Sequence, residues 1–134
     1  MPRDYKVNDT LAMLPGGRAS VPPWNKSEVM ERLGEDEDLL REMCGIFLSE
    51  SANLLQKLRH AVSDGQAEAV MRAAHSLKGE VSYLAAPAAT EAARRLEDMG
   101  HEHDVSRAAE ALALLEGEME RLRRSVREFV GAEP

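Results

Sequence analysis

Side chains suited to burial recur at spacings of three and four along residues 36–64, and this period constrains the fold more than any other feature of the sequence. Successive residues of an α-helix turn by about 100°, so these spacings place one set of side chains on one face. The set is Leu40, Cys44, Phe47, Ser51, Leu54, Leu55, Leu58 and Val62. We therefore predict a helix from Asp36 to about Asp64, closed by Gly65.

Two more helices are predicted on either side of a proline. The first runs from Gln66 to about Ala85, because the residue before a proline, here Ala86, is disfavoured in the α conformation. Pro87 fits the first turn of the second helix, which we expect to end near Gly100.

The last long helix is predicted from Asp104 to about Phe129, where apolar residues again keep helical spacing. A short helix over Glu28 to Leu33, capped by Ser27 and stopped by Gly34, precedes the others. The connections between the long helices are short, so successive helices should run antiparallel.

The composition agrees with an all-α fold. Only 4% of the 134 residues are aromatic, so the core must be built mainly from Leu, Ala, Val and Met, which suits closely packed helices. Residues 1–25 are rich in proline and glycine, and we interpret them as a flexible leader or linker in which Trp24 packs back on the domain. We expect one domain over residues 26–130 and a short tail over residues 131–134.

Charge and cysteine content exclude several functions. The formal charge of -7 would repel phosphate backbones and anionic lipid, so we expect neither a nucleic acid nor a membrane partner. Cys44 is the only cysteine, which excludes an intrachain disulfide and a cysteine-based zinc cluster and fits a reducing cytoplasm. No segment approaches the length of a transmembrane helix, and "LAML" near the N-terminus is too short for a signal-peptide core.

A histidine lies on the outer face of the second predicted long helix. The apolar stripe of that helix is Val70, Ala74, Leu77, Val81 and Leu84. His75 projects about 140° away from this stripe, Gly79 about 180° and Lys78 about 80°. This angular position argues against a histidine buried in the core and predicts that the imidazole lies in solvent.

The neighbours of His75 favour group transfer. Gly79 costs about 1 kcal/mol relative to alanine in a helix, and it lies one turn from His75, where it would open the approach to the ring. Lys78 can bring an ammonium toward an anion on the ring. An imidazole is a competent nucleophile at cellular pH, but the chain has no nucleotide-binding motif. We therefore expect a phosphate carrier that is not an enzyme.

The stretch "AHSLKGEVSYLAA" resembles the signature of the histidine-containing phosphotransfer (HPt) domain, in which Lys-Gly follows the phosphoacceptor histidine. "LGEDEDLLREMCGIFLSES" is similar to the start of the family's first long helix, and "ARRLEDMG" is similar to its Leu-Glu-bearing helix after the active site. The resemblance covers most of the chain from about Trp24 to Val130.

The resemblance implies an antiparallel up-down four-helix bundle, with the short N-terminal helix in addition. It also implies that His75 accepts phosphate, that Lys78 lies near the phosphoryl oxygens and that Gly79 gives the partner access. Phosphate would be exchanged with the aspartate of receiver domains in response regulators or hybrid histidine kinases. We expect a monomer with no cofactor and no metal of its own, the magnesium being in the receiver. Further candidates for partner contact are Met71, Arg72 and Ser82.

Two residues depart from the family pattern. Ala85 stands where glycine is usual, which disfavours a left-handed cap at the end of its helix. Glu80 stands where a small residue is common; it points about 140° away from His75, so it should influence partner choice rather than crowd the ring.

Three other interpretations compete with phosphate transfer. A metal-binding bundle could use His60, His101 and His103, but the repeated Glu-x-x-His pairs of di-iron bundles are missing. A structural adaptor could pair through "EMERLRRSVREF", although these charges fit a solvated helix face. A degenerate HPt-like domain would bind receiver or kinase domains without carrying phosphate, and a module of a chemotaxis-type kinase is a further option.

Overall fold

The computed structural model describes residues 22–131, and this range is folded entirely into α-helices and their connections. The helices are α2 (Lys26–Arg32), α3 (Glu37–Ser63), α4 (Ala67–Tyr83), α5 (Pro87–His101) and α6 (Ala108–Gly131). The predicted all-α class is thus confirmed. Most of the expected leader, residues 1–21, lies outside the described residues, as do residues 132–134 of the expected tail.

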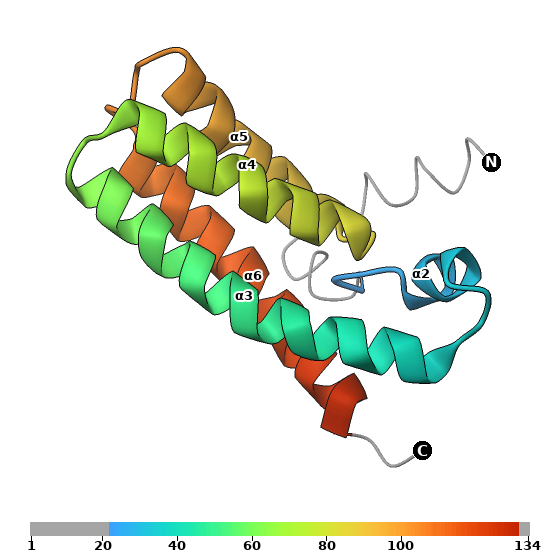
Figure 1. Ribbon diagram of the computed structural model, residues 1–134. Coiled ribbons are helices and arrows are strands. Elements are labelled where there is room, and N and C mark those ends of the chain that lie inside the picture. The colour runs from blue at the N-terminus through green and yellow to red at the C-terminus, as the bar shows by residue number, and fades with distance from the viewer. Residues whose placement is uncertain (1–21, 132–134) are drawn as a thin grey trace.

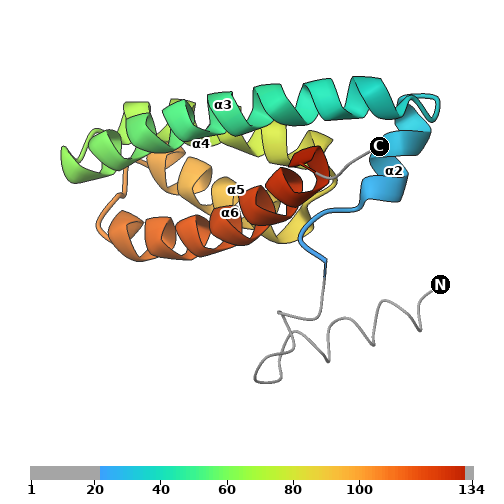
Figure 2. The ribbon, with the colours of Figure 1, turned by 90° about the horizontal axis from the view of Figure 1, so that it is seen from below.

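The four long helices form a closed ring in which each contacts two others. α3 packs against α4 and α6, and α5 packs against the same two helices from the other side. Successive helices run in opposite directions, and α2 lies across one end of the bundle next to the start of α3 (Figures 1 and 2). The predicted antiparallel four-helix bundle with an extra N-terminal helix is confirmed.

The core is built from the predicted helical stripes. The stripe of α4 is at most 2% exposed at every position, and Leu40, Cys44 and Leu58 of α3 are fully buried. Ser51, a polar member of the α3 stripe, is also buried and accepts a hydrogen bond from the Arg123 guanidinium of α6. The helical period therefore identifies the buried faces correctly.

Trp24 is part of this core, as predicted. Its ring is 7% exposed, meets Phe129 edge to face at 5.9 Å, and donates from Nε1 to Ser125 Oγ at 3.0 Å. Asn25 follows it and donates its backbone N–H to the Ala85 carbonyl at 2.9 Å. Both residues belong to the folded unit, although the sequence boundary assigns them to the leader.

Helix ends differ from the prediction at three places. The N-cap of α2 is Asn25, whose Oδ1 accepts from Glu28 N at 3.0 Å, and Ser27 lies inside the helix. α6 begins at Ala108 rather than Asp104, because the Asp104 carboxylate instead accepts from Ser106 N and Oγ in a local turn. α6 also continues to Gly131, the first residue of the expected tail.

Ala85 adopts the left-handed conformation that its side chain disfavours. Its φ is 54°, its N–H donates to Ser82 O at 2.9 Å, and Ala86 N–H donates to Val81 O at 3.1 Å. These two bonds form a Schellman motif, so α4 ends in the glycine-type cap despite the alanine. Alanine is expected to make this cap less favourable, but the cap forms, because the motif's hydrogen bonds and the burial of Ala86 offset the strain.

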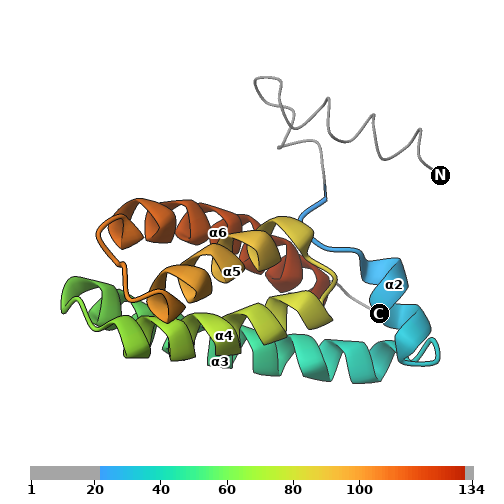
Figure 3. The ribbon, with the colours of Figure 1, turned by 90° about the horizontal axis from the view of Figure 1, so that it is seen from above.

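α5 ends one residue after Gly100, close to the predicted end, and the packing of Gly100 gives this glycine a further role. α5 runs beside α4 (Figure 3), and Gly100 is buried within α5 where the backbone of α4 comes close. A Cβ on Gly100 would stand 2.6 Å from Ala67 O and 2.6 Å from Met71 N. Glycine is therefore required here by the close approach of two helices.

Candidate functional site

The imidazole of His75 projects from the outer face of α4, as the helical phase predicts. Its side chain is 67% exposed, whereas Ala74 and Leu77 on the inner face are fully buried. α4 thus presents a nucleophilic ring to solvent while its opposite face holds the helix to the bundle.

Glu97 of α5 bridges two of the candidate side chains of α4. One carboxylate oxygen, Oε2, lies 2.6 Å from His75 Nδ1, and the other, Oε1, lies 2.7 Å from Lys78 Nζ. The Glu97 side chain is only 18% exposed, so this bridge is largely shielded from solvent, unlike the imidazole itself. The hydrogen bond from Lys78, and then that from His75, lower the pKa of Glu97 against the opposing effect of burial. Glu97 is therefore a carboxylate at neutral pH.

This bridge fixes the chemistry of the imidazole. A carboxylate can only accept a hydrogen bond, so the proton of the neutral ring lies on Nδ1 of His75. The lone pair then resides on Nε2, for which the described part of the chain provides no hydrogen-bond donor. The ring is held in the tautomer that exposes its nucleophilic nitrogen.

Glu97 is the site residue that the sequence reasoning missed. It lies in "ARRLEDMG", which resembles the family's Leu-Glu-bearing helix, but neither its residue type nor its spacing predicts a contact with His75. Leu96 beside it is fully buried, which places Glu97 at the edge of the buried face. Gly100, three residues further along α5, lets that edge approach α4 closely enough for the carboxylate to reach His75.

Gly79 leaves open space next to the ring. It is exposed, and a Cβ at this position would meet no heavy atom within 4 Å. Nothing inside the described bundle requires a glycine here, in contrast to Gly100. The open space agrees with the predicted access for a partner.

The other candidates for partner contact are not gathered into this cluster. Met71 is half-buried beneath Gly100, where α4 and α5 meet. Arg72 is exposed and pairs with Glu68 at 3.5 Å within α4. Ser82 is exposed near the end of α4, in a hollow that Pro87 also lines.

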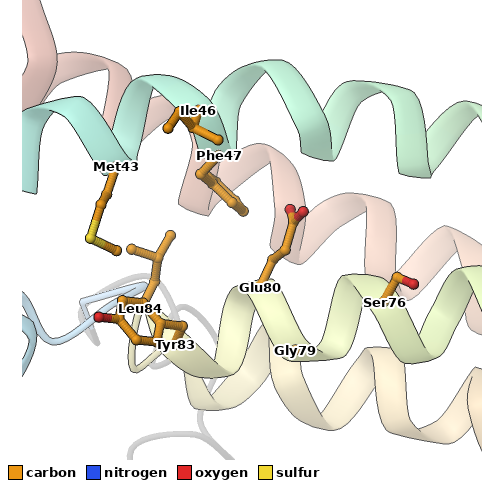
Figure 4. A pocket seen from close by; sticks show the side chains of 8 residues that line it. All are labelled: Met43, Ile46, Phe47, Ser76, Gly79, Glu80, Tyr83 and Leu84. Carbon is orange, nitrogen blue, oxygen red and sulfur yellow. The ribbon is translucent and has the colours of Figure 1, made fainter.

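A hollow of about 490 Å³ lies beside Gly79 between α3 and α4 (Figure 4). Its lining is mostly apolar and consists of Met43, Ile46, Phe47, Ser76, Gly79, Glu80, Tyr83 and Leu84. Glu80 is half-buried in it, and burial followed by the nearby carboxylate of Glu50 raises the pKa of Glu80 to about 7.

Residues 22–131 contain no group of three or more His, Cys, Asp or Glu side chains placed to hold a metal ion. The histidines considered for metal binding, His60, His101 and His103, therefore do not converge. Within the same range, no helix has the length and apolar character needed to cross a bilayer.

Comparison with known proteins gives two matches and one negative result. The family model of the Hpt domain matches residues 42–125, which include His75, Lys78, Gly79 and Glu97. The crystal structure of histidine-containing phosphotransfer protein B (HptB) from Pseudomonas aeruginosa PAO1 superposes with a TM-score of 0.78 at 23% sequence identity, over 86% of this chain and 100% of that chain. No curated protein sequence matches the chain significantly. At this identity, the likeness to HptB supports the fold.

Proposed function

The chain belongs to the Hpt domain family and is a histidine phosphotransfer protein of a phosphorelay, and from this premise we propose that His75 is the residue that carries the phosphoryl group. The observation that supports this assignment is the hydrogen bond of 2.6 Å from His75 Nδ1 to Glu97, which leaves Nε2 exposed with its lone pair. An exposed imidazole fixed in one tautomer is suited to nucleophilic attack.

The transfer step follows from this geometry. Nε2 of His75 attacks the phosphorus of an aspartyl phosphate; an N–P bond forms, and the P–O bond to the aspartate breaks, releasing its carboxylate. The ring keeps its proton on Nδ1 and so becomes positively charged. The Glu97 carboxylate, already in contact with Nδ1, stabilises that charge in both directions of the exchange.

Lys78 has a second role in the proposal. Its ammonium pairs with Glu97 in the free protein and is only 29% exposed. When a phosphoryl group is transferred to His75, the flexible lysine side chain can turn its ammonium toward the phosphoryl oxygens. The ammonium then still lies near the Glu97 carboxylate. Lys78 then offsets negative charge that develops during transfer.

The partners follow from the chemistry of the site. Hpt domains interact with receiver domains of two-component relays, and we propose that this chain exchanges phosphate with receivers of response regulators or hybrid kinases. Magnesium would be bound by the receiver, since His75 needs only a positioned phosphoryl donor. We further propose that the unit over residues 26–130 acts as a monomer in the cytoplasm, as a carrier without kinase activity.

Phosphotransfer profiling tests this function and identifies the partner together. Each receiver domain of the source genome is phosphorylated and mixed with the wild-type chain or with His75→Gln. We expect acid-labile label on the wild type from at least one receiver and none on His75→Gln, whose helical circular dichroism should be unchanged. Equal labelling of the variant would contradict the assignment of His75, and binding without any labelling would favour the degenerate HPt-like adaptor.

A further inference from the structure

The hollow beside Gly79 continues into a second one along the α3–α4 face. The second hollow, of about 430 Å³, is lined by Glu50, Asn53, Leu54, Lys57, Ser76 and Glu80. Ser76 and Glu80 line both, so the two hollows form one groove with an apolar half and a polar half. We call it the α3–α4 groove. Ser76 directly follows His75, so the groove begins beside the proposed phosphoacceptor.

Glu80 lies where the two halves meet. Figure 4 shows its side chain extending from α4 toward α3, beside Phe47. Its Oε1 atom is buried and forms no hydrogen bond with any described residue. Lys57 lines the polar half, yet it does not donate a hydrogen bond to Glu80 Oε1. A buried acceptor without a donor is unfavourable, so this oxygen of Glu80 is unsatisfied in the free protein, although protonated Glu80 can share a hydrogen bond with Glu50.

The exposed apolar side chains show that the groove is open to a partner. Ile46 on one rim is 54% exposed and Tyr83 near the other is 40% exposed, although both are large hydrophobic residues. A partner that covers these side chains also seals Glu80 from water. When it is ionised, the carboxyl must then receive a hydrogen bond from the partner, take up a proton or bear the full penalty of burial.

The charges near Glu80 favour a cation as that donor. Glu50 of α3 faces the same space, and burial together with this neighbour raises the pKa of Glu80 to about 7. A neutral donor would satisfy one oxygen but leave two acidic groups side by side. A lysine or arginine side chain offsets their repulsion and supplies the missing N–H.

We propose that Glu80 is a specificity-determining residue that selects receiver domains carrying a lysine or arginine on the surface that docks in the α3–α4 groove. This inference rests on the proposed function, since the occupant is the receiver that exchanges phosphate with His75. The apolar half of the groove supplies affinity for many receivers. Glu80 discriminates among them, because a receiver without the basic side chain leaves a buried charge unpaired.

The test measures transfer from the panel of phosphorylated receivers to four proteins at pH 8 and pH 6. The proteins are the wild type, Glu80→Gln, Glu80→Ala and the control Glu120→Gln. Glu120 is exposed on α6, diagonally across the bundle from α4. The Glu80→Ala variant keeps the test valid if Glu80→Gln does not fold. Thermal unfolding of all four proteins shows which of them are folded.

For the receivers that the wild type serves best, we expect both Glu80 variants to lower kcat/KM about 10-fold or more at pH 8, mainly through KM, as loss of a hydrogen bond to a charged group implies. Glu120→Gln should change it by less than about twofold, as an exposed pair allows. Above a pKa of about 7 the carboxyl is ionised, so the ratio of wild type to variant should shrink at pH 6. Labelling by phosphoramidate, which needs no docking, should be equal in the wild type and both variants.

The outcomes separate this inference from the proposed function. If the wild type accepts phosphate from receivers and both Glu80 variants accept it equally well at pH 8, the role of Glu80 is wrong and the role of His75 stands. If the variants lose labelling by phosphoramidate as well, Glu80 acts through the fold and the inference is also overturned. If no receiver labels the wild type, the proposed function fails and this inference fails with it.

Discussion

The Glu97 carboxylate of α5 accepts a hydrogen bond of 2.6 Å from His75 Nδ1 of α4 and so fixes which ring nitrogen can react. The same carboxylate holds Lys78 at 2.7 Å, so one side chain positions both the nucleophile and the cation that would meet the phosphoryl group. Because these contacts lower the pKa of Glu97, their contribution to stability is present at neutral pH and is lost as the pH falls through that lowered pKa.

Replacing the carboxylate should release both partners. In Glu97→Gln we expect transfer to slow by about 10-fold, comparable to one hydrogen bond to a charged group. The tautomer should change as well, because an amide can also donate to Nδ1. Nitrogen NMR of His75 checks this directly, with Asp98→Asn on the next residue of α5 as the control. An unchanged tautomer and rate in Glu97→Gln would contradict a positioning role.

Gly79 should matter for the approach of the partner to His75 and not for the stability of the bundle. Gly79→Ala should stabilise the bundle by up to about 1 kcal/mol, since a Cβ has open space there. Gly79→Gln should fold but slow transfer by at least about 10-fold, because its side chain occupies the approach to His75. Gly117→Gln on α6 is the matched control, as that glycine also has open space around it. Transfer by Gly79→Gln at the wild-type rate would show that the clearance is irrelevant.

Gly100 should behave in the opposite way. Gly100→Ala forces a Cβ against the backbone of α4, and we expect a loss of about 1–3 kcal/mol in the free energy of unfolding. Transfer should fall too, because α5 carries Glu97. Urea denaturation of Gly100→Ala beside Gly117→Ala gives the comparison, and the latter should be stabilised by up to about 1 kcal/mol. Similar stability of the two variants would argue against the close helix approach.

The strained cap of α4 should be relieved by the residue that the family pattern favours. Ala85 has a φ of 54°, and a left-handed L-residue costs roughly 1–2 kcal/mol. We expect Ala85→Gly to raise the free energy of unfolding by about 1 kcal/mol, whereas Ala52→Gly on the exposed face of α3 should lower it by a similar amount. A loss of stability in Ala85→Gly would show that the alanine methyl contributes more through packing than it costs in strain.

The buried faces could be predicted from sequence because burial itself imposes the helical period. The α4 stripe is an example, since Val70 to Leu84 repeat at spacings that only a helix places on one side. Helix ends follow weaker local preferences, which tertiary contacts override. Asp104 is a reasonable N-cap by type, yet it closes a turn with Ser106, and Ala85 accepts a cap conformation that its residue type disfavours.

The site also contains residues that the sequence predicts and one residue that it does not. His75, Lys78 and Gly79 lie within one turn, so their spacing alone shows that they share an exposed region of one helix. Glu97 is 22 residues away from His75 and reaches it only because Gly100 lets α5 approach α4. That approach depends on how two helices pack, which the period of neither helix encodes.

NMR of the phosphorylated, nitrogen-labelled protein can show whether His75 carries phosphate on Nε2. Coupling between phosphorus and ring nitrogen identifies the residue and the nitrogen that bear the phosphoryl group. We expect a single phosphohistidine at His75, bonded through Nε2 with the proton retained on Nδ1. Phosphate on Nδ1 of His75, or on His60, His101 or His103, would contradict it.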